Sequence, residues 1–115
     1  MKRTITLLLL FFALLSVSAK VKITRIDPTD WYVGMKDPTL QLMVYGEGIR
    51  DAEVSTDYPH ARIDSLVRLD SPNYLLVYMN LEGAQPGEMR LQFKLNGRKL
   101  TERYVLHARA KAAED

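Results

Sequence analysis

The sequence contains no cysteine, and its two histidines, His60 and His107, lie far apart in the chain. Without a thiol there is no disulfide, no thiolate nucleophile and no cysteine ligand for zinc. The two histidines also lack the spacing of a metal-binding pair. We therefore expect neither a metal site nor any other cofactor site in this chain.

Catalytic motifs are missing as well. There is no glycine-rich phosphate loop and no nucleophile elbow. Carboxylates such as Asp27, Asp37 and Asp70 border turns, where acceptor side chains commonly cap backbone N–H groups. No two carboxylates are set apart as the acid pair that glycoside hydrolysis needs. We expect no catalytic residue in this chain.

The N-terminal segment has the pattern of a secretory signal peptide. Lys2 and Arg3 precede an apolar run over residues 5–15, and small residues continue from there to Ala19. The run is too short for a comfortable membrane span, which needs about 20 apolar residues. We expect residues 1–19 to be cleaved, leaving an exported protein, periplasmic or secreted, with no membrane attachment. Because Lys2 and Arg3 account for the net charge of +2, the remaining chain is neutral and nucleic-acid binding is not expected.

Short β-type segments separated by turn residues occupy most of the chain after Ala19. In residues 62–69 the period of two predicts a half-buried strand with Ile63, Val67 and Leu69 on one face. The predicted strands are residues 21–26, 40–46, 52–55, 62–69, 74–81, 88–95 and 98–108. About seven short strands in a chain of this size predict an all-β fold, an immunoglobulin-like β-sandwich, with an open barrel as the alternative. We assign this domain to residues 20–109 and a polar tail or linker to residues 110–115.

Asn96-Gly97 predicts a two-residue hairpin loop, because both residues tolerate the positive φ of a type I′ turn. Such a loop fixes the register of the two flanking strands. The predicted core pairs are Phe93 with Leu100 and Met89 with Tyr104, and the predicted outer pairs are Lys94 with Lys99 and Arg90 with Arg103. The outer pairs form a basic stripe, which we interpret as a solvated face in preference to a site for an acidic partner.

The segments 40–45 and 74–79 are apolar on both faces. A two-layer sandwich covers only one face of each sheet, so an apolar outer face suggests that something else packs there. The alternative is that central strands simply carry a few exposed aromatics. The predicted docking surface consists of Met43, Tyr45, Tyr74 and Tyr78.

Three aromatic residues could instead bind sugar, because aromatic faces offer flat apolar area with a polar edge. They are Trp31, Tyr32 and Tyr58. For Trp31 we favour a role as an anchor that fills the edge of the sandwich or its junction with another domain.

Several segments together are similar to one known family. They are Ile26-Asp27-Pro28, Trp31 to Met35, Leu40 to Gly46, Asp70 to Tyr74 and Pro86-Gly87. The sequence from about residue 21 to 109 resembles the N-terminal immunoglobulin-like domain that precedes the catalytic barrel in bacterial cyclomaltodextrinases and neopullulanases, enzymes of the α-amylase superfamily.

The resemblance implies a non-catalytic accessory module of an α-glucan-degrading glycoside hydrolase, serving domain packing or oligomerisation. No catalytic residue of the family barrel has a counterpart here, so we expect a truncated or split enzyme. Its implied partners are an amylase-type barrel or a second copy, and an α-glucan or maltooligosaccharide. The alternatives are a stand-alone carbohydrate-binding module for maltooligosaccharides and a generic periplasmic interaction domain.

Overall fold

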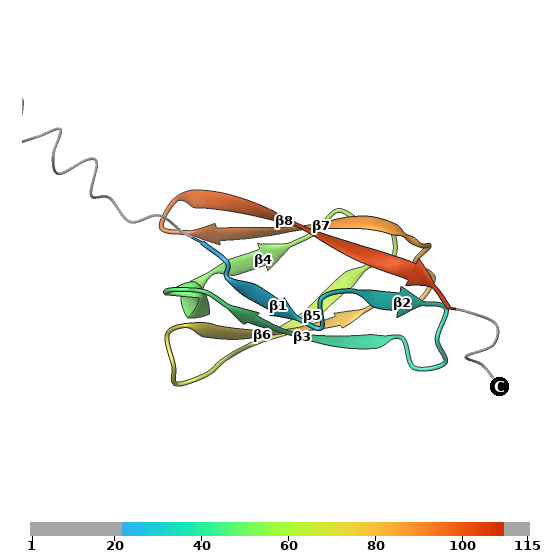
Figure 1. Cartoon of the computed structure of the whole chain (residues 1–115), viewed down its shortest axis with the longest axis horizontal. Coiled ribbons are helices and arrows are strands. Elements are labelled where there is room, and N and C mark those ends of the chain that lie inside the picture. Colours follow the sequence, from blue (N-terminus) through green and yellow to red (C-terminus); the bar gives the residue numbers. More distant parts are fainter. Residues whose placement is uncertain (1–21, 110–115) are drawn as a thin grey trace, which may run out of the picture.

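Two β-sheets packed face to face form the fold (Figure 1). The structure is a computed structural model and describes residues 22–109. The elements are β1 (Arg25–Asp27), β2 (Trp31–Val33), β3 (Thr39–Tyr45), the 3-10 helix η1 (Ile49–Asp51), β4 (Glu53–Ser55), β5 (Arg62–Arg68), β6 (Tyr74–Asn80), β7 (Gly87–Leu95) and β8 (Arg98–Ala108). The predicted immunoglobulin-like β-sandwich is confirmed.

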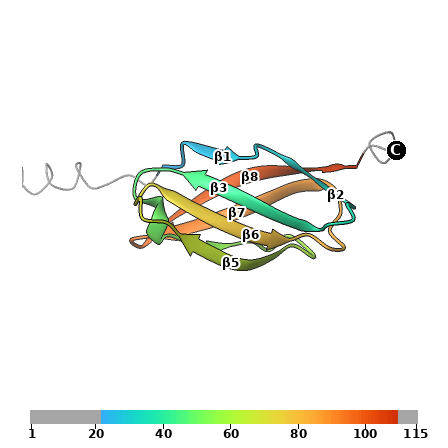
Figure 2. The same ribbon diagram turned by 90° about the horizontal axis from the view of Figure 1, so that it is seen from below.

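The first sheet has the strand order β1-β3-β6-β5, and the second has the order β2-β8-β7-β4. Neighbouring strands are antiparallel except β2 and β8, which run parallel. Figure 2 looks onto the first sheet, with the strands of the second sheet behind it. The N-terminal segment therefore contributes one edge strand to each sheet, and the two edges face each other along one side of the sandwich.

The strand β2 was not predicted. The sequence indicated one N-terminal strand ending before Pro28, whereas the chain resumes an extended course at Trp31 and joins the other sheet opposite Leu106. Proline has no N–H to continue a ladder, so the strand ends there. A strand of only three residues shows no visible alternation, which is why the pattern missed it.

The predicted orientation of β5 is confirmed at Ile63 and is wrong from Ser65 onward. The pairing with β6 is interrupted by a β-bulge between Ile63 and Ser65, so that one extra residue, Asp64, enters the strand. Ile63 lies opposite the buried Met79 and packs against the core. After the bulge the alternation is reversed, and Val67 is 38% exposed instead of facing the core beside Ile63.

The β7–β8 hairpin has the predicted register. Asn96 and Gly97 have φ values of 53° and 77°, as a type I′ turn requires. The observed pairs are Phe93 with Leu100, Met89 with Tyr104, Lys94 with Lys99 and Arg90 with Arg103, all as predicted.

The core lies between the two sheets and contains no buried charged residue in the described part of the chain. Every second residue of β3, β6 and β7 points into it, the alternation expected of half-buried strands. Its largest fully buried side chains include Tyr104, Phe93, Leu42, Ile49, Leu75 and Met79. With no disulfide, burial of this apolar layer is the main force that holds the sheets together.

The predicted signal peptide (residues 1–19) and the predicted tail (residues 110–115) lie outside the described residues. Within residues 22–109, no helix has the length and hydrophobicity needed to cross a membrane.

Candidate functional site

Trp31 and Tyr32 are neighbours on β2 and therefore point to opposite faces of the second sheet. Trp31 is half-buried and packs against the core, whereas Tyr32 is 44% exposed on the outer face. Their ring centroids are 6.3 Å apart in an edge-to-face arrangement. The two rings thus do not form one flat surface.

Tyr58 is lodged at the end of the sandwich. Its ring packs against the core, and its hydroxyl donates a hydrogen bond to the carbonyl oxygen of Gln85 at 2.6 Å. A Cβ added to Gly87 would lie only 2.5 Å from this hydroxyl oxygen, so the tyrosine occupies space that the glycine leaves free. Of the three aromatics predicted to bind sugar, Tyr32 is the most exposed, whereas Trp31 and Tyr58 are half-buried.

Tyr32 belongs to a small cluster with His107 and Asp30. It lies opposite His107 in the parallel β2–β8 pairing, and the two ring centroids are 5.4 Å apart. His107 Nε2 lies 2.6 Å from Asp30 Oδ2. These contacts join the start of β2 to the end of β8 and hold Tyr32 beside a hollow of about 250 Å³, lined by the loops after β2 and β6.

The predicted docking surface forms one continuous patch on the outer face of the first sheet. Tyr45 lies opposite Tyr74, with ring centroids 4.8 Å apart, and Arg25 lies 5.8 Å from the centre of the Tyr45 ring. Met43 pairs with Leu76 in the next row, and Gln41 with Tyr78 in the row after that. All four predicted residues are half-buried and share this face.

The bulge in β5 enlarges this patch. Because it reverses the alternation, Val67 lies opposite Leu76 on the outer face. Neither residue was included in the predicted surface. For Val67, the period of two in residues 62–69 predicted the core face. The change of face is caused by the inserted Asp64, which can be recognised only from the pairing of β5 with β6. We call the whole set the outer patch: Met43, Tyr45, Val67, Tyr74, Leu76 and Tyr78.

Apart from the exposed Tyr32 and Val105, the outer face of the second sheet is polar. It carries the basic stripe, Arg90, Lys94, Lys99 and Arg103, together with Gln92 and Thr101. Within residues 22–109, the only ion pair made by the stripe joins Arg103 to Glu88 at 3.6 Å, and both side chains are exposed. The two faces of the sandwich therefore differ in chemistry, one apolar and one cationic.

Some titratable side chains of the described residues have pKa values that are shifted by structural contacts. No group of three or more His, Asp or Glu side chains within residues 22–109 could hold a metal ion. The pKa of Asp37 is lowered because the hydroxyl and the backbone N–H of Thr39 donate hydrogen bonds to its carboxylate. The pKa of Tyr104 is raised because burial disfavours the phenolate, but its hydroxyl is engaged by the carbonyl of Pro28. Both shifts have structural causes.

A family model described as "Cyclomaltodextrinase, N-terminal" matches residues 25–110. The chain belongs to this family. The match begins at the first residue of β1 and includes every strand of both sheets. This cyclomaltodextrinase N-terminal domain is an accessory domain of cyclomaltodextrinase-type enzymes, and no catalytic domain is present in the 115 residues. The resemblance stated from the sequence is thereby confirmed, and the outer patch is a surface of such an accessory domain.

Proposed function

We propose that this domain is a non-catalytic module of an exported α-glucan-degrading glycoside hydrolase of the cyclomaltodextrinase or neopullulanase type, and that it packs against an amylase-type catalytic barrel. The outer patch is the observation that carries the proposal. A solvated sheet would alternate apolar and polar side chains, whereas β3 and β6 place half-exposed apolar side chains on the face that the sandwich does not cover.

The composition of the outer patch suits a protein interface. Tyrosine and methionine are enriched in the buried centre of such interfaces, and charged residues are depleted there. Charged side chains border the outer patch: Arg25 and Asp27 pair with each other on β1 at 2.9 Å, and Arg62 and Asp64 pair on β5 at 2.7 Å. An apolar centre with a charged rim is the arrangement of a stable interface, which buries about 800 Å² on each partner.

The test is sedimentation velocity of the chain mixed with an amylase-type barrel from the same genome, expressed without its own N-terminal domain. We expect a one-to-one complex with the unmodified chain. Met43→Glu places a charge at the centre of the outer patch and should abolish the complex, because an interfacial carboxylate without a partner is costly to desolvate.

Gln92→Glu is the matched control, since it adds the same charge to the outer face of the other sheet. The complex should survive this substitution. Absence of any complex with the unmodified chain, or equal loss in both variants, would refute the proposal. Self-association through the outer patch would appear as a dimer without the barrel, sensitive to Met43→Glu, and would support oligomerisation in place of barrel packing.

Binding of maltooligosaccharides is a second candidate function, favoured by the exposed ring of Tyr32 beside its hollow. Trp31 is the only tryptophan and lies 6.3 Å from the Tyr32 ring, so its fluorescence reports on that site. Titration with maltoheptaose should shift the Trp31 emission if sugar binds, and Tyr32→Ala should remove the shift. An unchanged emission spectrum at saturating sugar excludes this function.

A further inference from the structure

Most of β8 has an unpaired edge. β7 pairs with β8 along its length, but on the other side β2 pairs only with Leu106, His107 and Ala108. Among residues 22–109, no strand pairs with residues 98–105 on that side. No backbone hydrogen bond in the described turns and loops involves these residues either. A strand edge of this kind is a template for another extended segment.

The hairpin geometry tells which backbone groups are free. In an antiparallel ladder, hydrogen-bonded pairs alternate with pairs whose N–H and C=O groups point away from each other. A two-residue type I′ loop is closed by a hydrogen-bonded pair, here Leu95 with Arg98. Counting from that pair, the backbone groups of Lys99, Thr101 and Arg103 are directed to the free edge.

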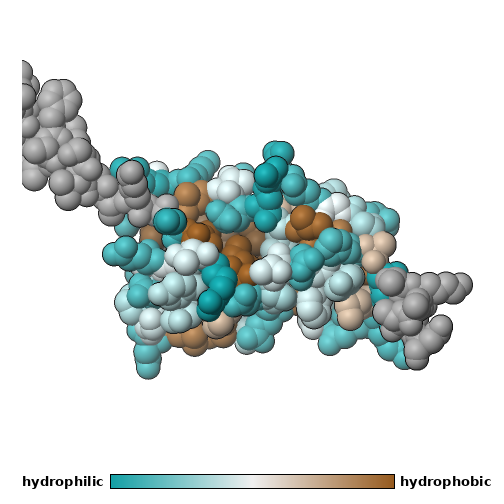
Figure 3. All heavy atoms as spheres, in the orientation of Figure 1, coloured by the Kyte–Doolittle hydropathy of each residue, from teal (hydrophilic) through white to brown (hydrophobic). Residues whose placement is uncertain are grey.

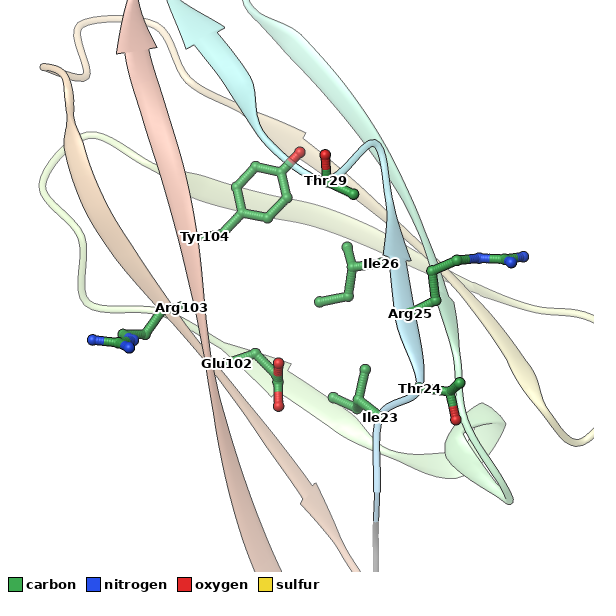
Figure 4. A pocket seen from close by; sticks show the side chains of 8 residues that line it. All are labelled: Ile23, Thr24, Arg25, Ile26, Thr29, Glu102, Arg103 and Tyr104. Carbon is green, nitrogen blue, oxygen red and sulfur yellow. The ribbon is translucent and has the colours of Figure 1, made fainter.

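A groove runs beside this edge. It lies between β1 and β8 and has a volume of about 280 Å³. Ile23 and Ile26 point into it from the β1 side, and Glu102 and Tyr104 point into it from β8 (Figure 4). The side chain of Arg103 points away from it (Figure 4). In the space-filling view, hydrophobic residues are exposed along this side of the sandwich (Figure 3).

The charges beside the edge are mainly positive on the outer face, where Glu88 pairs with Arg103, and Glu102 faces the groove. On the outer face, the side chains of Lys99 and Arg103 lie on β8 next to Lys94 and Arg90 on β7. Antiparallel pairing of two copies of β8 centred on Thr101 would put Lys99 of one copy opposite Arg103 of the other, and like charges in that position are destabilising. The same cations attract carboxylates, so the charge pattern favours an acidic partner over a second copy.

The other sheet provides a contrast. Its edge strand β5 contains a β-bulge at Asp64 and is flanked by charged residues, two devices that prevent strand addition. Regular one-to-one pairing with β7 continues along β8 from Arg98 to Leu106. The β8 edge is therefore regular enough to accept an added strand, whereas the bulge and the charged residues of β5 oppose strand addition.

We propose that the free edge of β8 binds an extended acidic segment of a partner protein by β-strand addition. The added strand hydrogen-bonds to the backbone of Lys99, Thr101 and Arg103. Its outward side chains are acidic and lie beside Lys99 and Arg103. Its inward side chains are apolar and enter the groove against Ile23 and Ile26, except for a basic residue beside Glu102.

The probe is the capped heptapeptide Glu-Val-Glu-Lys-Glu-Val-Glu, whose side-chain pattern is the same in both strand directions. Amide hydrogen exchange of the isotopically labelled chain, followed by NMR, is the measurement. In the free chain the amides of Lys99, Thr101 and Arg103 should exchange quickly, and those of Leu100 and Glu102 slowly. With saturating peptide, exchange of the first three should slow about tenfold or more, because they gain hydrogen-bond partners.

Two controls sharpen the experiment. Thr101→Pro removes one edge donor without breaking the β7–β8 ladder, since its N–H points away from β7, and should weaken peptide binding about tenfold, the effect of one backbone hydrogen bond. Thr101→Val keeps the donor and should bind as the unmodified chain does. The charge-reversed peptide Lys-Val-Lys-Glu-Lys-Val-Lys should bind at least tenfold more weakly.

Failure of the acidic peptide to bind, binding without protection of the three amides, or equal binding of both peptides would overturn the proposal. Protection of the same amides at high chain concentration without peptide would also overturn it, in favour of edge-to-edge pairing of two copies. None of these outcomes involves the outer patch on the other sheet.

Discussion

The hydroxyl of Tyr104 donates a hydrogen bond to the backbone carbonyl of Pro28 at 2.8 Å. Tyr104 lies on β8 in the second sheet, and Pro28 lies in the segment where the chain leaves β1 of the first sheet for β2 of the second. The bond therefore fixes the crossing between the sheets. It also satisfies a phenol whose ring is 1% exposed, and a buried hydroxyl without a partner would be costly.

Tyr104→Phe should destabilise the domain at neutral pH. The variant keeps the buried ring but leaves the Pro28 carbonyl without this donor, which corresponds to about 0.5–1.5 kcal/mol in the free energy of unfolding. Urea denaturation followed by circular dichroism measures the difference. An unchanged unfolding midpoint would show that the bond contributes nothing to stability.

The same substitution should alter the alkaline limb of the stability curve. Burial, with a smaller contribution from Asp30, raises the pKa of Tyr104 above its ordinary value of 10.0. The unfolded chain releases this proton first as pH rises, so the stability that Tyr104 provides is complete below about pH 10 and is lost above it. The free energy of unfolding should fall more steeply above pH 10 in the unmodified chain than in Tyr104→Phe. Parallel curves would contradict this.

Because Tyr58 contacts Gly87, substitutions at these two positions should have non-additive effects on the free energy of unfolding. In Gly87→Ala the new methyl group would lie 2.5 Å from the Tyr58 hydroxyl oxygen, so the ring must move and its bond to Gln85 is strained. We expect a loss of about 1–3 kcal/mol in the free energy of unfolding, the usual cost of overpacking.

Tyr58→Phe removes the clashing oxygen, and the next nearest ring atom, 3.5 Å from the added Cβ, makes an ordinary contact. The double variant should therefore be more stable than the sum of the two single losses predicts. Gly87→Ala combined with Tyr104→Phe is the control and should be additive. If both combinations are equally additive, the close contact is not the source of the cost.

The sequence predicts those parts of the fold and of the site that are set by contacts between residues close together in the chain. The β7–β8 register follows from Asn96-Gly97, because a two-residue loop fixes the pairing of its own flanks. The shared face of Met43, Tyr45 and Tyr74 follows from alternation within two regular strands. In both cases the information is local.

The remaining features depend on residues distant in sequence. The pairing of Trp31 with Leu106 joins segments 75 positions apart, and no local pattern reports it. The bulge at Asp64 is imposed by the register with β6, so alternation alone placed Val67 on the wrong face. A hydrophobic pattern gives the orientation of a strand only while the pairing is regular.

The bulge itself leads to a prediction about two deletions. Deleting Asp64 removes the extra residue but leaves Ile63 opposite Met79 and Ser65 opposite Tyr78, so every later side chain keeps its face. The Arg62–Asp64 ion pair is lost, but both side chains are exposed and solvent screens their attraction, so this loss should change stability little. Deleting Leu66 instead brings Ser65 to the core position and should cost about 2 kcal/mol or more. Similar melting temperatures for the two deletions would contradict the register.

A last prediction concerns the tyrosine pair at one end of the outer patch. Tyr45 and Tyr74 are directly opposite on β3 and β6, with ring centroids 4.8 Å apart at an angle of 45°. A double-mutant cycle with Tyr45→Ala and Tyr74→Ala should give a coupling of about 0.5–1.5 kcal/mol in the free energy of unfolding, the range for aromatic pairs. Met43→Ala with Tyr74→Ala, which are not directly opposite, should show weaker coupling. A coupling near zero for the tyrosines would mean that contact between the two rings adds nothing to the stability of the isolated domain.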